Sequence, residues 1–555
     1  MMHPIKLKDN RFGANAPLFK CEQAATPFGS TNEELNTQTI SKNGKQVLKK
    51  FNGCTLAELV AQGKDAVVDL SQLQHLDDKG RKKLCFFKLA DDNDNQFRLE
   101  TGNLMGVLRF RDKETSVQVE ILSRFDNEKN NFFLNYLLSK VYNFAIGVEA
   151  VSAERSSLLP ILLDIVFVRR LGEAAKAGLL RHYREFRNND WSFKGSLDLA
   201  RHIRENIPLM HGIAYRKREI DLDVPVNRMI LMAALTVNRR LPSFFEGNQD
   251  AADALCQLRM GVTEERDLRA VLSHRDCRET VSHPFFREVW EPLRQIARMI
   301  LEDEQWTLFP ETTTEYEVSG IVFDGSWLWE EYIAKVLGRA GFEHSVKENG
   351  AVKRVLPVFR DGDARFAPDF YHQHEVDDNG EKKTVYDCVF DAKYKRSNPN
   401  GGRNDVHQVL CYLLLTGAKL GGLVFPPVDE KCEDSDSINA EENGGLDNKG
   451  IKAKGKVAGW SIPREISSPY SKEPSILWSC FSWGELTTDG SWHSFEECMG
   501  AQEDKLLILP TEPSFWVELL SGQPQFADKC PWEKLKDSDW EALLAKQPQL
   551  AKYRR

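Results

Sequence analysis
A strand-like stretch near residue 390 restricts what this chain can fold into more than its overall composition does. The run from Val385 to Phe390 is rich in β-branched and aromatic residues, and Asp391-Ala392-Lys393 follows it directly. Because side chains on a strand alternate between two faces, Asp391 and Lys393 are expected to point to the same side. Pro368-Asp369 lies far enough upstream for a neighbouring strand to bring the Asp369 carboxylate beside Asp391.

Two carboxylates and a lysine at one strand end are groups that metal-dependent phosphodiester cleavage uses. Mg²⁺ prefers oxygen ligands and keeps several of its waters, and Mn²⁺ accepts the same ligands. Asp369, Asp391 and the backbone carbonyl of Ala392 are therefore the predicted metal ligands. A bound metal lowers the pKa of its water and stabilises charge on the phosphoryl oxygens. Lys393 is predicted to orient or deprotonate the attacking water, or to neutralise charge that grows in the transition state.

Simpler explanations exist for each piece taken alone. A Pro-Asp dipeptide is usually a turn. An Asp-x-Lys sequence at a strand end is often a solvated edge with a surface ion pair of little energetic value. The case for a catalytic site therefore depends on the elements that flank the pair.

A predicted helix, residues 326–339, precedes the pair. Its apolar residues recur with the helical period and form one face, made of Leu328, Trp329, Tyr332, Ile333, Val336 and Leu337. Glu330 lies at the border of that face, from where its carboxylate could reach a site over the sheet, while Glu331 points away. An ordinary amphipathic helix with two solvated glutamates explains the same pattern.

A second predicted helix, residues 404–415, follows the pair. Asp405, Gln408 and Tyr412 are spaced so that they share one stripe of this helix. Gln408 is predicted either to contact the DNA backbone or to position Lys393. The alternative is a polar helix face with a half-buried tyrosine. Residues 421–426 are then typical of another buried strand.

The order of these elements resembles the PD-(D/E)xK nuclease fold. It runs helix, strand, strand with Asp369, strand with Asp391 and Lys393, helix with Gln408, strand. Asp369, Asp391 and Lys393 match the motif of that superfamily, and Glu330 and Gln408 match its looser accessory positions. The predicted fold class is α/β, mixed and multidomain, with an N-terminal β and helical region and a nuclease domain built on a central mixed sheet flanked by helices.

The composition is that of a globular protein with an acidic balance. The 555 residues are 41% hydrophobic and 28% charged, and the net charge is −9. A DNA-active chain with this charge needs a local basic surface or a partner that holds the DNA. The 11 cysteines are scattered without a Cys-x-x-Cys pair. This pattern suits a reducing compartment better than a disulfide framework or a structural zinc site.

No signal peptide and no membrane-spanning segment are expected. Residues 1–51 are polar and lack an apolar core. The most apolar run, Leu158 to Val168, is too short to cross a bilayer and contains Pro160 and Asp164. That run predicts a core helix. We therefore expect no membrane partner and a cytoplasmic location.

Four regions are expected along the chain. Residues 1–100 predict a small β or α/β module. Residues 101–315 predict a mainly helical region that opens with a hairpin and docks a partner. Residues 316–465 predict the nuclease domain, and residues 466–555 form a tryptophan-rich extension.

The C-terminal part contains a predicted linker and several tryptophans. Residues 427–458 are polar and predict a disordered linker that interrupts the nuclease sheet, because a strand is expected at 457–462. The tryptophans of the extension could stack on unpaired bases. Packing in the core or docking on the main body is the favoured prediction. Residues 532–544 predict an amphipathic helix.

The segments before the nuclease motif are similar to those of the McrC family, the nuclease subunit of McrBC-type restriction systems. The similarity covers about residues 100–430. Besides the nuclease motif, the matching pieces are the hairpin that ends in Ile121-Leu122-Ser123-Arg124, the Gly178-Leu179 to Tyr183 stretch, Lys194 to Asp198, and Asn227-Arg228. Ser123-Arg124 departs from the Pro-Lys that the family commonly shows at this place.

This resemblance implies a division of labour between the chain and a motor protein. In that family the N-terminal half docks into a ring of McrB-like AAA+ subunits that hydrolyse GTP, and it stimulates the hydrolysis. The C-terminal domain cuts DNA when translocation stalls, and the motor recognises methylated or otherwise modified DNA. The sequence contains no Gly-x-x-x-x-Gly-Lys-Ser/Thr loop, so the chain itself is not expected to bind a nucleoside triphosphate.

The predicted function is therefore a Mg²⁺-dependent (or Mn²⁺-dependent) DNA endonuclease subunit of a McrBC-like antiviral restriction complex. It would cleave DNA delivered by an AAA+ GTPase or ATPase ring and stimulate that ring. Two alternatives remain open. One is a non-catalytic scaffold or DNA-binding subunit of the same kind of complex, and the other is a motor-independent nuclease of DNA repair.

Overall fold
The structure of this chain is a computed structural model. It describes residues 5–22, 31–32, 37–63, 67–69, 84–90, 93, 96–112, 115–126, 131–142, 159–208, 211–279, 281, 284–302, 316–345, 356–357, 365–378, 381–395, 403–418, 420–426, 464–465, 477–482, 491–511 and 541. The disordered linker and the following strand expected at 427–462 lie outside these residues, as does nearly all of the helix expected at 532–544.

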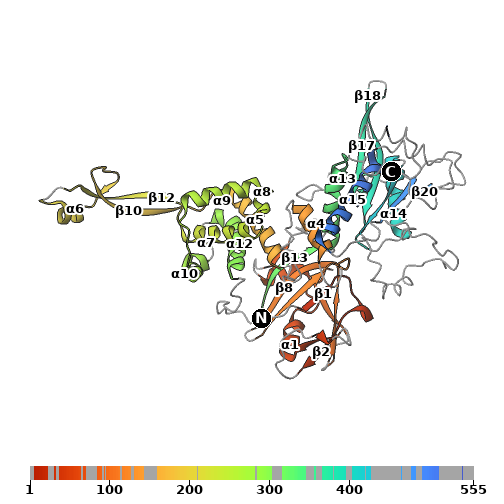
Figure 1. The fold of residues 1–555 in the computed structure, drawn as a ribbon, viewed down its shortest axis with the longest axis horizontal. Helices are drawn as coiled ribbons and strands as arrows, with labels where there is room; N and C mark the ends of the chain where they lie inside the picture. Colours follow the sequence, from red (N-terminus) through yellow and green to blue (C-terminus); the bar gives the residue numbers. More distant parts are fainter. Residues whose placement is uncertain are drawn as a thin grey trace.

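A five-stranded sheet joins segments from distant parts of the sequence (Figure 1). Its order is β1-β9-β8-β13-β5, with bounds Ile5–Lys8, Ser116–Leu122, Leu104–Asp112, Tyr316–Asp324 and Val67–Asp69. The hairpin expected at 106–122 is thus confirmed. The neighbouring strand β13 approaches it very closely. A Cβ at Gly106 would lie 2.1 Å from the carbonyl oxygen of Ile321, and one at Gly320 would lie 2.0 Å from that of Val107. Both glycines have positive φ, so this pairing requires them.

A second five-stranded sheet is built almost wholly from N-terminal residues. Its order is β3-β4-β2-β7-β6, with bounds Thr31–Asn32, Thr37–Ser41, Leu18–Glu22, Gln96–Thr101 and Phe87–Ala90. The helices of this region are α1, Lys42–Lys50, and α2, Leu56–Gly63, with a short 3₁₀ turn at Gly13–Asn15.

Strand pairing crosses two of the boundaries expected from the sequence. β1 and β5 come from the first 100 residues, but they pair with β9 and β13. β13, assigned above to the start of the nuclease domain, pairs with β8 over nine residue pairs from Tyr316 to Asp324. Local sequence patterns cannot reveal such partners, because each strand satisfies its hydrogen bonds only through a segment far away in the chain.

The middle of the chain forms a helical body. Its helices are α5 Leu159–Ala177, α7 Pro225–Arg240, α8 Ser243–Glu246, α9 Gln249–Gly261, α10 Leu268–Ser273, α11 Arg275–Arg278 and α12 Pro284–Glu302. The preceding helix α4, Phe132–Tyr142, lies outside this body and packs beside α13, Gly325–Gly338. Asn227 is buried in it and donates hydrogen bonds to the carbonyl oxygens of Leu180 (2.9 Å) and Leu222 (2.8 Å). The neighbouring Arg228 forms two 2.7 Å hydrogen bonds to Asp223. Both residues of the Asn-Arg pair therefore hold the fold together.

A long hairpin projects from this helical body, although the sequence predicted mainly helix here. It consists of β10, His182–Asp190, and β12, Ile213–Asp221, with β11, Ser196–Leu197, and α6, Leu199–Asn206, at its far end. Figure 1 shows it pointing away from the rest of the molecule. Nine consecutive residue pairs join β10 to β12. Much of its apolar surface is exposed.

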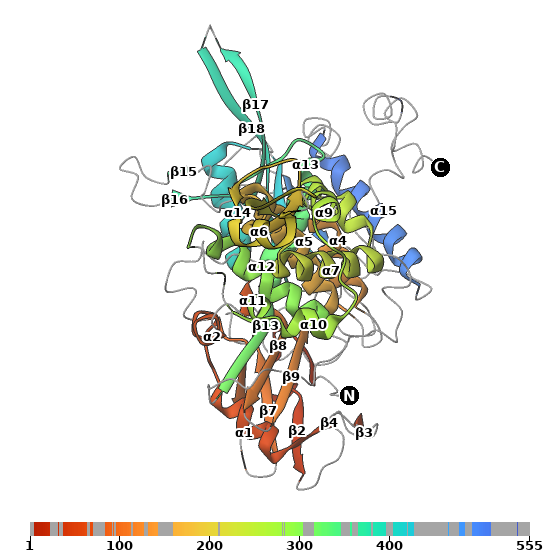
Figure 2. The ribbon, with the colours of Figure 1, turned by 90° about the vertical axis from the view of Figure 1, so that its left-hand side faces the viewer.

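A six-stranded mixed sheet carries the predicted nuclease motif. Its order is β14-β17-β18-β19-β21-β20, with bounds Glu343–His344, Phe370–Asp378, Glu381–Ala392, Leu420–Phe425, Leu477–Ser482 and Arg464–Glu465. Helices α13, Gly325–Gly338, and α14, Arg403–Thr416, flank it, and a two-stranded ribbon joins β15, Leu356–Pro357, to β16, Arg365–Phe366. The helices and strands expected around the motif are thus confirmed. β17 and β18 extend past the other strands as a protruding arm (Figure 2).

The C-terminal extension docks on the nuclease region. Its helix α15, Trp492–Thr511, buries Trp492 against Phe132 of α4, with ring centroids 5.6 Å apart. Its Glu503 accepts hydrogen bonds from Tyr136 (2.7 Å), Tyr332 (3.0 Å) and Arg339 (2.6 Å). For Trp492, packing on the main body is therefore confirmed.

Asp126 is buried just before α4, and its protonation should make stability depend on pH. Its carboxylate accepts a 2.8 Å hydrogen bond from the Phe133 N–H. Burial outweighs this contact and raises the pKa of Asp126 from 3.8 to about 8. Between these values the folded state holds a proton that the unfolded chain has released, so stability is lost as the pH rises.

We expect Asp126→Asn, which keeps an acceptor but cannot ionise, to gain stability over the wild type as the pH rises from about 4 to about 8. The gain should approach 1.4 kcal/mol per pH unit, and thermal unfolding across that range measures it. A melting temperature that falls by the same amount at every pH would contradict this account.

The described residues contain neither a disulfide nor a helix suited to crossing a membrane. The eight cysteines whose side chains are described are all free thiols. None of the described helices combines the length and the apolar character that a bilayer span requires.

Candidate active site
Asp369 and Asp391 lie side by side because of the strand register. β17 and β18 are antiparallel, and Phe370 is paired with Phe390. The next pair outward is therefore Asp369 and Asp391. Directly opposite residues of an antiparallel pair project to the same face. The backbone N–H of Ala392 donates a 2.9 Å hydrogen bond to Asp369 Oδ2, which brings the third predicted ligand residue beside the first.

Asp391 lies on the face of the sheet that α14 covers. Along β18, Cys388 and Phe390 belong to the main core cluster, whereas Val389 packs with residues of α14. Period-two alternation places Asp391 on the same face as Val389. Its residue surface is only 1% exposed. Neither carboxylate oxygen accepts a hydrogen bond of normal geometry from the described residues, while Oδ2 forms an ion pair with Lys393 Nζ.

Lys393 is held by a chain of polar contacts from α14. Its ammonium donates a 2.9 Å hydrogen bond to Gln408 Oε1, and Gln408 Nε2 donates a 2.8 Å hydrogen bond to the Tyr412 hydroxyl. The second contact orients the amide so that its oxygen, not its nitrogen, faces the lysine. Gln408 thus positions Lys393, as one of its two predicted roles requires.

Glu330 approaches the pair from α13. Its carboxylate is half-buried and contacts Nε2 of His344 at 2.8 Å. The charge of Glu330 raises the pKa of both Asp369 and Asp391. The structure therefore brings together all five predicted catalytic side chains, which come from two helices and two adjacent strand ends.

Burial and crowded negative charge determine the electrostatics of this cluster. Burial, followed by the charges of Asp391 and Glu330, raises the pKa of Asp369 well above its ordinary value. Burial also raises the pKa of Asp391, although Lys393 opposes the shift. Burial lowers the pKa of Lys393, but the Asp391 and Asp369 carboxylates outweigh it, so the pKa of Lys393 is raised. Three carboxylates thus face a single ammonium group.

The residues present fit a hard divalent cation. Lys393 supplies one positive charge to the Asp369, Asp391 and Glu330 carboxylates, so a bound cation would balance the remaining negative charge of the site. Asp369 and Asp391 offer oxygen donors of the kind that Mg²⁺ prefers. Within the described residues, no group of three or more His, Cys, Asp or Glu side chains is placed to hold a metal ion. The fit to Mg²⁺ therefore depends on the two aspartates alone.

Sequence reasoning missed two contacts at the rim of the site. His344 on β14 pairs with Glu330, and the Lys395 ammonium pairs with Asp405 of α14. Side-chain alternation along β14, which pairs with β17, could have predicted that His344 faces the site. No local sequence pattern predicts the contact between Lys395 and Asp405, because it forms only when the end of β18 and helix α14 meet in space.

Comparisons with known proteins agree with the predicted family. A family model described as McrBC 5-methylcytosine restriction system component matches residues 99–426. No curated protein matches the chain.

Two solved structures from Thermococcus gammatolerans are similar to it. One is a half-complex from a tetradecameric assembly of McrB AAA+ hexamers with bound McrC, at 15% identity over 83% of this chain and 93% of that chain, with a TM-score of 0.34. The other is a cryo-EM structure of the McrBC complex, at 14% identity over 62% of this chain and 90% of that chain, with a TM-score of 0.27.

The family match decides the identity, since it covers more than half of the 555 residues and includes Asp369, Asp391 and Lys393. It also spans the hairpin, the helical body and the site just described. The resemblance to the McrC family seen in the sequence is thereby confirmed. This chain belongs to the McrBC 5-methylcytosine restriction system component family.

Proposed function
We propose that this chain is the Mg²⁺-dependent DNA endonuclease subunit of a McrBC-like restriction complex, acting in the cytoplasm. The observation that carries the proposal is the buried Asp369–Asp391 pair with Lys393 against it. Such a concentration of buried charge costs folding free energy unless it serves a ligand. Membership of a restriction-system family supports DNA as the substrate.

In the proposed mechanism the chain supplies ligands, an oriented ammonium group and a fixed backbone. Asp369, Asp391 and the Ala392 carbonyl would hold Mg²⁺ or Mn²⁺, which polarises the scissile phosphate and activates water. Lys393, fixed by Gln408, would orient that water and offset the negative charge that develops on the phosphoryl oxygens. Glu330 would bind the metal through water, or accept a proton at the rim of the site.

The experiment that tests this function is a cleavage assay with a McrB-like AAA+ protein, a nucleoside triphosphate and modified DNA. Cleavage that requires both the partner and Mg²⁺ is expected. No cleavage at any Mg²⁺ or Mn²⁺ concentration, with the complex formed, would instead make the chain a scaffold. Full cleavage without the partner would make it a motor-independent nuclease.

The projecting hairpin is the proposed docking element for an AAA+ ring. Residues 181–221 hold nine Lys and Arg against six Asp and Glu, in a chain of net charge −9. Exposed apolar side chains gather at its far end, namely Trp191, Phe193, Leu197, Leu199, Ile203 and Ile207. Leu199 and Ile203 are four residues apart on α6 and share one stripe of that helix, and Ile207 follows directly after its last residue. An apolar stripe carried this far from the core fits a protein partner.

We expect Ile203→Asp to weaken binding to the AAA+ partner by about 10- to 100-fold, the cost of burying one such apolar side chain. Stimulation of nucleotide hydrolysis should fall in parallel. Ile203 is 51% exposed, so the fold should tolerate the change. Met260→Asp is the matched control, because Met260 is 83% exposed at the C-terminal end of α9, near the base of the hairpin and not at its far end.

Binding is measured by titration with purified components. Unchanged partner affinity in Ile203→Asp would remove this stripe from the docking surface. Unchanged partner affinity together with weaker DNA binding would assign the stripe to DNA.

A further inference from the structure

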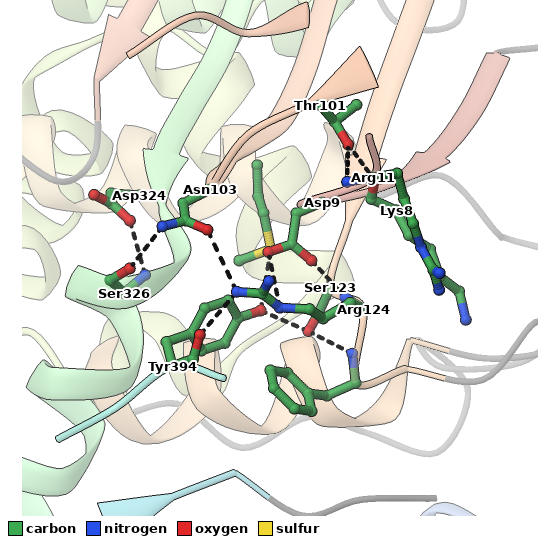
Figure 3. Close-up of polar contacts among 12 residues, drawn as sticks. Lys8, Asp9, Arg11, Thr101, Asn103, Ser123, Arg124, Asp324, Ser326 and Tyr394 are labelled. Carbon is green, nitrogen blue, oxygen red and sulfur yellow. Dashed lines mark hydrogen bonds and ion pairs between the residues drawn. The ribbon is translucent and has the colours of Figure 1, made fainter. Parts of the chain in front are cut away.

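Five chain segments meet at one end of the sheet β1-β9-β8-β13-β5, which is called the N-terminal sheet from here on (Figure 3). β1 and β9 are parallel, so Asp9 and Ser123-Arg124 leave the sheet at the same edge. β8 starts there after Asn103, and β13 ends there before Ser326. The fifth segment is Tyr394, the residue that follows Lys393. The N-terminal sheet and the catalytic strand β18 are therefore in direct contact.

Tyr394 is buried in the N-terminal sheet, while Lys393 beside it belongs to the site. The Tyr394 hydroxyl is 2.8 Å from Ser123 Oγ, and its ring meets the Phe125 ring edge-on, with centroids 5.0 Å apart. The side of the ring is also closely packed. A Cβ at Gly325 would lie 2.8 Å from Tyr394 Cε1 and 2.9 Å from Met105 Cε. The ring therefore has little freedom to move.

Arg124 contacts both the backbone and the ring of Tyr394. Its Nη2 donates a 2.8 Å hydrogen bond to the Tyr394 carbonyl oxygen, and its guanidinium lies 4.9 Å from the centre of the Tyr394 ring. Asp9 holds Arg124 in turn. Its carboxylate accepts a 2.6 Å hydrogen bond from the Arg124 backbone N–H and lies 3.6 Å from the guanidinium. Asn103 Oδ1 accepts a further, 3.3 Å contact from Arg124.

The contacts between Arg124 and Tyr394 restrain Lys393, because Lys393 and Tyr394 are neighbours in the chain. The Lys393 N–H is bonded to the Val424 carbonyl oxygen at 2.9 Å, and the Lys393 carbonyl oxygen accepts a 3.0 Å bond from Lys395 N–H. A fixed Tyr394 therefore fixes the peptide that follows Lys393. A shift of Tyr394 would displace the lysine relative to Asp391 and Gln408, and small displacements of this kind cost large factors in rate.

We propose that Arg124 and Tyr394 form a latch through which the N-terminal sheet positions Lys393 for DNA cleavage. The contacts of Arg124 and Tyr394 described above include no proposed metal ligand. Arg124 is thus a positioning residue, and this role rests on the nuclease function proposed above. Docking of the N-terminal half would therefore act on the catalytic strand directly, through Arg124 and Tyr394.

The test compares Arg124→Gln with the wild type in the assembled complex. At saturating DNA, the single-turnover cleavage rate should fall by about 10- to 100-fold. The KM for DNA, the affinity for Mn²⁺ and the affinity for the AAA+ partner should not change. Arg124→Lys keeps the charge but not the planar fork, so its rate should be intermediate. Arg170→Gln, on the exposed face of α5, is the matched control.

A double-mutant cycle separates the latch from general damage to the fold. In a Lys393→Ala background, Arg124→Gln should cause no further loss of rate, because the two residues act in series. An additive loss in that background would overturn the proposal. An Arg124→Gln rate equal to that of the wild type would also overturn it.

A readout without cleavage keeps the two proposals distinguishable. Amine labelling followed by mass spectrometry should show faster modification of Lys393 in Arg124→Gln, with Lys335 on α13 unchanged as the internal reference. If the wild-type complex cuts no DNA, the nuclease function fails, and the labelling result alone decides whether Arg124 holds Lys393. Equal labelling of Lys393 in both proteins would refute the latch.

Discussion
Replacing Asp391 with asparagine is expected to slow DNA cleavage by about a thousandfold or more, because metal-assisted charge stabilisation is worth several kcal/mol. Asparagine has nearly the same size, so binding of the AAA+ partner should be unaffected. Mn²⁺ should raise the melting temperature of the wild type and not that of the variant, because a ligand stabilises only the protein that binds it. Cleavage in the assembled complex and thermal unfolding with and without Mn²⁺ measure the two effects.

Asp387→Asn is the matched control for this experiment. Asp387 lies on the same strand but contacts His372 (2.6 Å) and His374 (2.9 Å) on the protruding arm. Its replacement should leave the cleavage rate and the Mn²⁺ effect unchanged. If Asp391→Asn cuts DNA at the wild-type rate, Asp391 is not part of the mechanism. Loss of partner binding in Asp391→Asn would instead indicate damage beyond the site.

Replacing Glu503 with alanine is expected to lower the free energy of unfolding by about 3 kcal/mol, because buried partners lose their acceptor. The phenol groups of Tyr136 and Tyr332 and the guanidinium of Arg339 all donate to this carboxylate. The melting temperature should fall by several degrees. The change should also loosen α13, which carries Glu330, and so weaken Mn²⁺ binding.

Glu497→Ala provides the comparison on the same helix. The Glu497 side chain is 70% exposed and pairs with His493 at 3.3 Å. Its loss should change stability by less than about 0.5 kcal/mol. Equal stability of the two variants would mean that α15 contributes little to the nuclease region. The C-terminal extension would then be an appendage rather than part of this fold.

The order of elements around the motif could be predicted because it follows local rules. Period-two alternation placed Asp391 and Lys393 on one side of a strand, and helical spacing placed Gln408 and Tyr412 on one stripe. These rules depend only on neighbours in the sequence. The strand register, with Phe370 opposite Phe390, places the Asp369 and Asp391 carboxylates side by side, as the motif predicted.

The projecting hairpin shows where local rules failed. Most residues of β10 are exposed, on both faces of the strand. β10 therefore lacks the alternation of apolar and polar residues that marks a strand with one buried face. The pairing of β10 with β12 was therefore not predicted. The hairpin is instead held by backbone pairing between Tyr183 and Ile220 and the pairs that follow.

The sequence by itself determined the family, the order of elements around the motif and the residues that gather at the candidate site. Tertiary structure alone decided that β13 belongs to the N-terminal sheet, that Glu503 supports α13, and that Arg124 holds Tyr394. The Arg124 and Tyr394 groups are 270 residues apart in the chain. The physical reason is that periodicity records which face of an element is buried. It does not record which distant segment buries that face.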